Sequence, residues 1–306
     1  MRIVSLLPSA TEIVYALGQG ASLVGVSHEC DYPPDANRKP RMIETVFDNT
    51  RIGSQEVDAL VAEHMKEGKS IYRIKFDELK RADPDLIITQ ELCDVCAVDA
   101  ADVLEVVNRL GKPISVLSLN PHTLADVKGD IRNVAEAMRC MDEAEPLIAS
   151  LEAKVNYIKA LTANAGKVRA FCVEWLKPLM NAGHWIPELL DSAGGLDELA
   201  VRGRPSGPMD WPRVVEYDPE VVVLMPCGFT TERTVQEAPR FLELPRANEL
   251  TAIRNHRLYA TDGHNYFSRS GPRLFDAVAI LAQMLHPELF NAPMDPKLGT
   301  RVELPA

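Results

Sequence analysis

Side chains that can ligate a transition metal or stack on a flat ring follow several predicted strands of this chain. In an open α/β sheet, ligands bind outside the carboxyl ends of the strands, so residues at those ends are the first candidates for a site. The candidates are His28, Glu29, Cys30, Cys93, Cys96, Glu174, Trp175, His184, Trp185, Cys227, Phe229, His264, Tyr266, Phe267 and Arg269.

The types of these side chains indicate which ligand they would hold. Tryptophan, tyrosine and phenylalanine offer large rigid surfaces for a conjugated ring. Histidine and cysteine supply nitrogen or sulfur to a transition metal. Together they predict a site for a flat, largely apolar molecule that carries a metal.

Each candidate also has a purely structural interpretation. Cys93-x-x-Cys96 is half of a zinc site or a redox pair, but it could equally line the packing of its loop. Cys227 lies between proline and glycine and could be a small buried hydrophobe. Trp175 and Trp185 could pack at the edge of a lobe instead of touching a ligand. We expect two other cysteines in the core and four other histidines at the surface or at caps: Cys140, Cys172, His64, His122, His256 and His286.

Alternating strand and helix patterns surround these candidates and predict an α/β fold with mostly parallel sheets. Apolar segments with strand character recur along the whole chain, and most are followed by a helical pattern. The expected strands are residues 3–7, 23–26, 85–89, 114–117, 167–173, 221–225 and 258–260.

A helical segment from Thr123 to Leu161 separates two similar half-chains. Its apolar residues recur at helical spacing. Pro146 is tolerated only in the first turn of a helix, so we expect two helices with a joint near Asp142, the second of roughly 18 residues or about 27 Å. The predicted domains are an α/β lobe at 1–141, a linker helix at 142–165, and a second α/β lobe with a tail at 166–306.

The two half-chains share one signature. In both, a short helix ends at Asp-Pro and a hydrophobic strand begins, at residues 81–88 and at residues 216–223. Proline stops the helix and fixes the turn.

Composition excludes several classes of function. The chain has 306 residues and a formal net charge of -11, which argues against binding nucleic acid through phosphate contacts. No apolar segment approaches the length of a membrane span, and no signal peptide precedes the first strand. We therefore expect a cytoplasmic protein, or a periplasmic one if a leader has been removed. The six cysteines are too few for a disulfide scaffold.

An enzyme is the weaker hypothesis. The sequence has no nucleophile elbow, Walker loop or Gly-x-Gly-x-x-Gly motif. A cysteine nucleophile or redox pair at Cys93 and Cys96 would need a lowered thiol pKa, and the acidic neighbours Glu91 and Asp94 oppose that.

Four segments carry a resemblance to a known family: Ile3–Glu12, Val24–Ser27, Asp31–Pro34 and Asp83–Ile87. They resemble the class III substrate-binding proteins of ABC importers, and most of all the vitamin B12 (cobalamin) binding group. The resemblance implies two Rossmann-like lobes joined by a single long helix, a ligand in the cleft between them, and no catalysis.

The resemblance also assigns positions. The first cleft loop of the family falls on His28–Cys30, the next on Gln90–Cys96, and the first loop of the second lobe on Glu174 and Trp175. The last falls on Tyr266, Phe267 and Arg269. Several positions that are aromatic in cobalamin importers hold His, Glu or Cys here. The family docks on its permease through one acid per lobe: Asp77 suits the first lobe, whereas Pro212 occupies the second-lobe position, with Asp210 nearby.

These observations predict a non-enzymatic binder of cobalamin or a related corrinoid, for uptake or intracellular handling. The corrin would lie against Trp175, Trp185, Tyr266 and Phe267, with His28 or His264 as axial ligand and Arg269 on an amide or phosphate. The alternatives are another metal chelate, such as haem or a siderophore, and a bare ion such as zinc. The predicted ligands of a bare ion are His28, Cys30, Cys93, Cys96 and Cys227.

Overall fold

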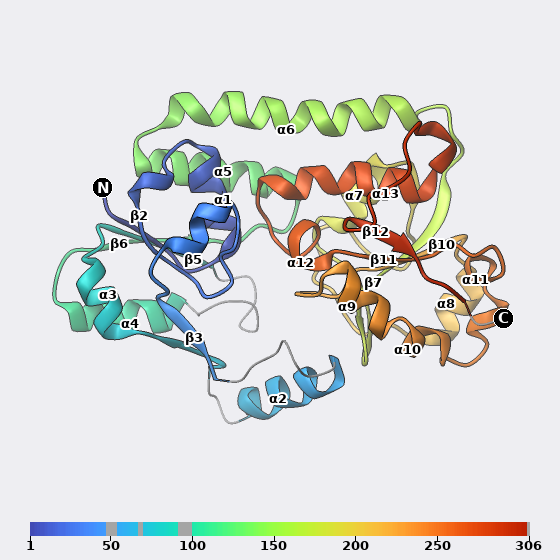
Figure 1. Ribbon diagram of the computed structural model, residues 1–306, viewed down its shortest axis with the longest axis horizontal. Coiled ribbons are helices and arrows are strands. Elements are labelled where there is room, and N and C mark those ends of the chain that lie inside the picture. The colour runs from blue at the N-terminus through green and yellow to red at the C-terminus, as the bar shows by residue number, and fades with distance from the viewer. Residues whose placement is uncertain (47–53, 67–69, 91–99, 305–306) are drawn as a thin grey trace. The chain divides into compact units, whose positions relative to one another are not determined.

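The computed structural model describes residues 1–46, 54–66, 70–90 and 100–304 (Figure 1). The chain forms two compact units. The first comprises Met1–Pro121 with Ala125–Ala149, and the second His122–Leu124 with Ser150–Ala306. Both contain parallel sheets with connecting helices, which confirms the predicted fold class.

The first unit is built on a four-stranded parallel sheet. Its strand order is β2 (Leu23–Val26), β1 (Ile3–Ser5), β5 (Leu86–Gln90) and β6 (Ser115–Leu119). The short strands β3 (Ile43–Thr45) and β4 (Tyr72–Ile74) form a separate antiparallel pair. The helices that begin in this part of the chain are α1 (Pro8–Ala16), α2 (Ser54–Lys66), α3 (Phe76–Ala82), α4 (Ala100–Leu110) and α5 (Leu124–Met138), with 3-10 turns at Gly20–Ser22 and Pro34–Arg38.

The second unit repeats this plan and adds strands at both edges. Its parallel strands are β9 (Gly195–Leu196), β7 (Val168–Leu176), β10 (Val221–Leu224) and β11 (Leu258–Thr261), while β8 (Leu179–Asn181) and β12 (Gly299–Arg301) pair antiparallel. The remaining elements are α7 (Ile186–Ser192), α8 (Trp211–Tyr217), α9 (Thr231–Glu237), α10 (Pro239–Leu242), α11 (Thr251–Arg254), α12 (Gly263–Tyr266), α13 (Ala277–Leu285), and 3-10 turns at Ala247–Glu249, Pro272–Asp276 and Pro287–Leu289.

The sheets of the two units have the same strand order, and their central strand pairs have the same register. Strand order β2-β1-β5-β6 corresponds to β9-β7-β10-β11. Ile3 pairs with Leu86 in the first unit, and Ala170 pairs with Val221 at the equivalent place in the second. The Asp-Pro turn predicted as a repeat precedes the equivalent strands β5 and β10.

In the first unit, an arginine fixes the Asp-Pro turn to the start of the central strand. Arg2 precedes β1, and its Nε donates to the carbonyl oxygens of Ala82 at 2.9 Å and Asp83 at 3.2 Å. Its backbone N–H donates to the Asp85 carboxylate at 2.7 Å. Asp83 ends α3 in the left-handed conformation, with φ 48°.

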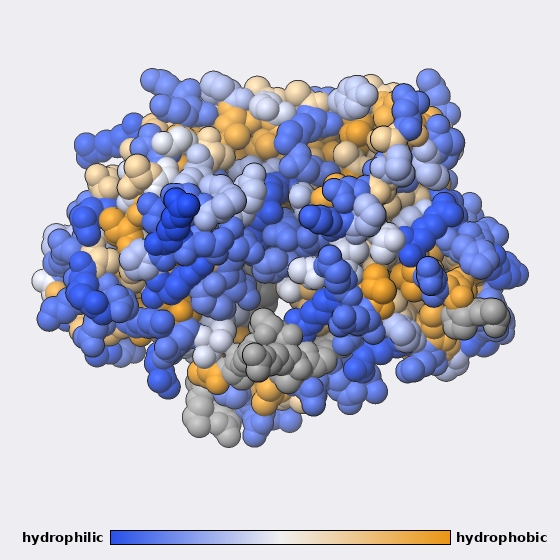
Figure 2. Space-filling view, in the orientation of Figure 1, coloured by the Kyte–Doolittle hydropathy of each residue, from blue (hydrophilic) through white to orange (hydrophobic). Residues whose placement is uncertain are grey.

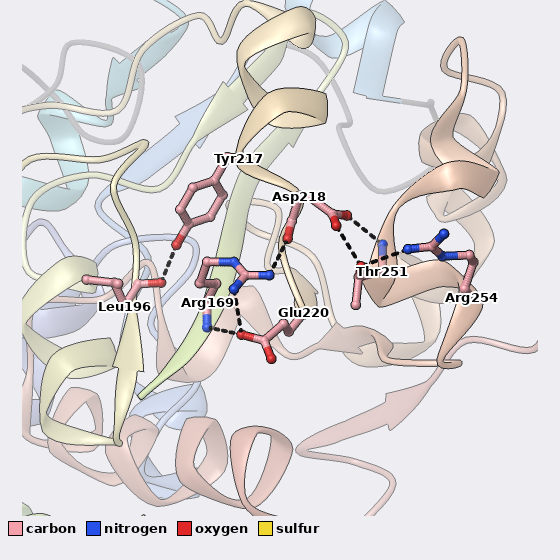
Figure 3. Close-up of polar contacts among 7 residues, drawn as sticks. All are labelled: Arg169, Leu196, Tyr217, Asp218, Glu220, Thr251 and Arg254. Atoms are coloured by element: carbon pink, nitrogen blue, oxygen red, sulfur yellow. Dashed lines mark hydrogen bonds and ion pairs between the residues drawn. The ribbon is translucent and has the colours of Figure 1, made fainter. Parts of the chain in front are cut away.

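The second unit repeats these contacts at equivalent positions (Figure 3). The Nη2 of Arg169 donates to the carbonyl oxygen of Asp218 at 3.1 Å, and its backbone N–H donates to the Glu220 carboxylate at 3.0 Å. Asp218 ends α8 with φ 45°. Its carboxylate accepts from the backbone N–H and the hydroxyl of Thr251, both at 2.7 Å, and so holds the first turn of α11.

The predicted break in the central helical segment is present, but two details differ. The break falls at Arg139 and Cys140, because Arg139 takes a left-handed φ of 59° and ends α5. Helix α6 (Met141–Thr162) then has 22 residues and carries Pro146 beyond its first turn, so the predicted first-turn position was wrong. Helix α6 belongs to the first unit up to Ala149 and to the second from Ser150. The domain boundaries at 141/142 and 165/166 stay predictions.

Two further expectations were wrong in detail. Glu174 and Trp175 lie within β7, not after it, because β8 pairs back on the strand and extends it to Leu176. The sequence also predicts a single closing helix at residues 271–285, whereas the structure has a 3-10 turn followed by α13 there. His286, predicted at the surface or at a cap, is the C-cap of α13; it is buried, and its Nε2 lies 3.3 Å from the carbonyl oxygen of Gly194.

Each unit has its own hydrophobic core, one including Val4, Leu79 and Ile87 and the other Phe171, Val222 and Phe241. Hydrophilic residues cover much of the face seen in Figure 2. Among the described residues, no helix has the length and apolar character needed to cross a bilayer.

Candidate functional site

Two aromatic residues meet at the carboxyl ends of neighbouring strands in the second unit. Trp175 lies at the end of β7, and Phe229 follows β10. Their rings are 5.5 Å apart and meet edge to face, at 63°. The Arg233 guanidinium, from α9, lies 3.6 Å from the centre of the Phe229 ring. We call these three residues the aromatic platform; a cation against a ring and an edge-to-face pair both fix the orientation of the aromatic side chains.

Besides the Arg233 guanidinium, the aromatic platform has one polar group, the indole N–H of Trp175. The Nε1 atom is buried and has no hydrogen-bond partner among the residues that the structure describes. Buried polar groups are nearly always hydrogen-bonded, and an unpaired donor costs about 1–3 kcal/mol. A ligand that offers an acceptor here would recover that free energy.

Glu174 lies beside the platform in a hydrogen-bonded position. Its carboxylate accepts from the Ser206 hydroxyl at 2.5 Å, and the Ser206 oxygen in turn accepts from the backbone N–H of Gly183 at 2.8 Å. Burial raises the pKa of Glu174, whereas the bond from Ser206 opposes that rise. The sequence does not predict a role for Ser206, because its partner Glu174 is distant along the chain.

The segment after β11 contributes a histidine and an arginine. Asp262 accepts from the backbone N–H of Asn265 at 2.9 Å and so fixes the first turn of α12. The Nη2 of Arg269 lies 2.5 Å from the Nε2 of His264. Since a guanidinium only donates, the His264 Nε2 is the acceptor and its proton is on Nδ1. In this arrangement Nε2 is engaged, so His264 could ligate a metal only after Arg269 moves away.

The predicted stacking aromatics divide into two groups by exposure. Trp185 and Phe267 are buried, and the Trp185 Nε1 donates to the carbonyl oxygen of Phe267 at 2.9 Å, which favours the packing interpretation for both. Tyr266 is half-buried, and the Arg273 guanidinium lies 5.7 Å from its ring centre. Trp175 and Tyr266 are therefore the partly accessible rings of the predicted set.

His184 has a close histidine neighbour that sequence reasoning assigned to the surface or to a cap. The rings of His122 and His184 are 5.6 Å apart, and the rings of His184 and Trp185 are 5.4 Å apart. Burial and the neighbouring His122 lower the pKa of His184. No local motif predicts this pair, since the two histidines lie far apart in the sequence.

In the first unit, Arg41 holds the loop that carries His28. Its Nη1 donates to the carbonyl oxygens of Ser27 at 2.7 Å and of Cys30 at 2.6 Å. The His28 ring lies 5.5 Å from the Tyr72 ring. Burial lowers the pKa of His28, although the carboxylate of Glu29 opposes this. A neutral, oriented imidazole at the end of β2 suits metal ligation.

The predicted metal ligands are not gathered into a metal site in the described part of the chain. It holds no group of three or more His, Cys, Asp or Glu side chains placed to bind an ion. Cys30 is fully buried and its sulfur accepts from the Thr11 hydroxyl at 3.1 Å, while Cys227 is half-buried. Cys93 and Cys96 lie outside the described residues. The expected core positions of Cys140 and Cys172 are confirmed.

Both candidate docking acids are exposed. Asp77 lies in the first turn of α3, and Asp210 directly precedes α8, the equivalent helix of the second unit. A cavity of about 410 Å³ in the second unit is lined by residues between Tyr259 and Arg301, and none of the predicted site residues is among them.

Comparison with known proteins agrees with this architecture. The family model described as periplasmic binding protein matches residues 3–264. A vitamin B12-binding protein of Vibrio parahaemolyticus is 24% identical over 279 residues, which cover 90% of this chain and 86% of that protein. The solved structure of the periplasmic vitamin B12 binding protein BtuF of Vibrio cholerae matches with a TM-score of 0.66 at 22% identity and covers 94% of this chain and 96% of that one. The periplasmic haem-binding protein RhuT from Roseiflexus sp. RS-1 matches with a TM-score of 0.69, also at 22% identity, over 94% of this chain and 99% of that one.

Proposed function

Because this chain belongs to the periplasmic binding protein family, a family of binding proteins and not of enzymes, we propose that its ligand is cobalamin or a related corrinoid. Substrate binding of the kind that serves ABC import is the activity of the family. The choice of ligand rests on one observation: an aromatic platform beside a buried indole N–H that has no partner among the described residues.

A corrinoid suits this platform for two reasons. Its flat ring system would lie against Trp175, and the amide groups on its rim are acceptors for the unpaired indole N–H. Arg269 would donate to an amide or to the phosphate of the ligand. The relatives named as vitamin B12-binding proteins support the same choice.

Haem is the second candidate. Three arginines, Arg233, Arg269 and Arg273, lie on the segments that follow β10 and β11, and guanidinium groups bind carboxylates such as the haem propionates. The structural match to a haem-binding protein supports it too. The Arg233 guanidinium already lies against the Phe229 ring, which favours the largely uncharged rim of a corrinoid.

A titration of the full chain with hydroxocobalamin and, separately, with haemin distinguishes the two. Tryptophan fluorescence reports binding, and the visible spectrum reports a protein ligand on the metal. We expect saturable quenching at one equivalent of hydroxocobalamin and weaker binding of haemin. Tighter binding of haemin would replace the corrinoid by haem, and no binding of either, with stoichiometric metal in the purified protein, would favour the bare-ion alternative.

The indole N–H of Trp175 is tested by the Trp175→Phe variant. It keeps an aromatic ring but removes the donor, so we expect corrinoid affinity to fall by roughly two- to tenfold, the equivalent of one net hydrogen bond. The matched control is Trp211→Phe, since the Trp211 Nε1 already donates to the carbonyl oxygen of Pro245 at 2.7 Å. Equal affinities for Trp175→Phe and the unchanged protein would remove the platform from the proposal.

His28 is the candidate axial ligand in the first unit. Its Nε2 is buried and has no hydrogen bond to a described residue, although the Glu29 carboxylate lies 3.7 Å away. We expect the visible spectrum of bound hydroxocobalamin to differ from that of the free ligand, and His28→Gln to abolish the difference. If His28→Gln leaves the shift intact while His264→Gln removes it, the axial ligand belongs to the second unit.

Delivery to an ABC permease is part of the proposal. Asp77 and Asp210 are the acids that would contact it, and reversing both to lysine should prevent uptake in cells without changing ligand affinity. The cytoplasmic location expected from the sequence is tested by cell fractionation, since relatives are named as periplasmic proteins and lipoproteins.

A further inference from the structure

Two histidines that the proposed corrinoid site does not use lie together in the second unit. His122 precedes α5, and His184 follows β8. Their ring centres are 5.6 Å apart and the ring planes are inclined by 34°. Both residues are half-buried.

This separation is close to that of two imidazoles bound to one metal ion. With Zn–N distances of about 2.0–2.1 Å and tetrahedral geometry, two ligating rings have their centres roughly 5 Å apart. The observed separation of the ring centres is within a few tenths of an ångström to one ångström of this value.

The backbone at each histidine is held in place. His184 has a φ of 51°, an uncommon conformation for a residue other than glycine. Its N–H donates to the carbonyl oxygen of Arg204 at 2.6 Å, and its own carbonyl oxygen accepts from Gly203 at 2.9 Å. Near His122, the backbone N–H of Leu124 donates to the Glu188 carboxylate at 3.1 Å. Uncommon backbone conformations persist where the surroundings fix them, often at functional sites.

The side-chain chemistry of the pair also suits a metal, because imidazole nitrogen is a typical ligand for zinc, copper, nickel and cobalt.

We propose that His122 and His184 together bind a divalent transition-metal ion, with water or a small chelator in the remaining coordination positions. Two protein ligands leave the site open, so the ion exchanges readily. The proposal does not depend on the identity of the organic ligand.

A titration of the reduced full chain with Co²⁺ tests the proposal, because cobalt reports its ligands in its spectrum. We expect one equivalent to bind with the weak ligand-field bands of nitrogen coordination and without an intense thiolate charge-transfer band. His122→Gln and His184→Asn should each lower the affinity at least about tenfold, since even partners outside the coordination shell change metal affinity by 10–100-fold. Asparagine is chosen at position 184 because it tolerates positive φ.

The matched control is His256→Asn, which removes an exposed histidine of the same unit that also has a positive φ, 54°, and should leave the Co²⁺ affinity unchanged. A thiolate band would overturn the proposal by assigning the ion to cysteines. So would equal affinity of the double variant and the unchanged protein.

A second measurement avoids variants altogether. Diethyl pyrocarbonate modifies accessible imidazoles, and peptide mass spectrometry reports each site. We expect Zn²⁺ to protect His122 and His184 together while His256 stays reactive. Modification of both at the same rate with and without Zn²⁺ would contradict the proposal even if the variants do not fold.

Discussion

At the residue scale, Asp130 is a buried acid in α5. Only 6% of its surface is exposed, and its Oδ2 has no hydrogen-bond partner among the described residues. Burial raises its pKa to about 7; a hydrogen bond from Asn133 opposes the rise, and the charge of Asp126 adds to it. The carboxyl is therefore protonated in the folded chain at pH values where it ionises in the unfolded chain.

The consequence is a pH dependence of stability with a definite sign. The contribution of Asp130 is fully present below its unfolded pKa of about 4 and is lost as the pH rises through 7. We expect Asp130→Asn to remove this loss and to raise the free energy of unfolding at pH 8 by on the order of a few kcal/mol. Urea denaturation at pH 5 and pH 8 measures it; a difference between the two proteins that is the same at both pH values would exclude Asp130 as the cause.

Residue types located much of the candidate site, but they did not supply its partners. Trp175, Phe229 and His264 were predicted from their places after strands, and the structure places them at the carboxyl ends of β7, β10 and β11. Arg41 and His122 were not predicted, because their contacts join segments that are distant in the sequence and follow no fixed spacing. The solvent exposure of the aromatic residues could not be predicted either, since nothing in the sequence separates buried Trp185 from half-buried Trp175.

At the scale of the element, the aspartate of the second Asp-Pro turn connects two helices. Asp218 ends α8 and at the same time begins α11, because its carboxylate accepts two bonds from Thr251 (Figure 3). Burial acts to raise the pKa of Asp218, but the bonds from Thr251 and the nearby arginines lower it overall. The stabilisation is present above the unfolded pKa and is lost as the pH falls through the lowered folded value.

Removing this carboxylate should loosen both helices. We expect Asp218→Ala to lower the free energy of unfolding at pH 7 by about 1–2 kcal/mol, the cost of losing a helix N-terminal cap. Asp218→Asn keeps an acceptor and tolerance of positive φ, so it should lose less. Thermal melting of both variants gives the comparison, and an Asp218→Ala protein as stable as the parent would show that Thr251 finds another acceptor.

Elements with a strong periodic pattern were predicted closely, and short ones were not. The sequence predicts a short helix at Trp211–Tyr217 before the second Asp-Pro turn, and α8 has the same bounds. Strands β8, β9 and β12 have two or three residues each and were missed, since so short a segment shows no periodicity. Tertiary pairing defines such strands: β9 consists of two residues that pair with the start of β7.

At the scale of the whole molecule, two separate cores predict two separable unfolding events. Phe241 is fully buried in the core of the second unit and Ile87 in that of the first. Truncating either to alanine should cost about 2–5 kcal/mol. We expect calorimetry to show that Phe241→Ala lowers the melting temperature of one transition and Ile87→Ala that of the other. A single transition displaced equally by both variants would mean that the units unfold as one.

The arginine that fixes each Asp-Pro turn has a practical consequence for handling the protein. Arg2 is the second residue of the chain, and its backbone N–H is bound to Asp85. Any segment joined directly before Met1 therefore lies one residue from a structural contact. The equivalent residue, Arg169, donates its backbone N–H to Glu220 in the same way, although it is preceded by the segment that connects it to α6. A tag joined by a short linker can enter β1 in the way that this segment enters β7, whereas a cleavage site or purification handle inserted between Arg2 and Ile3 would break the contact.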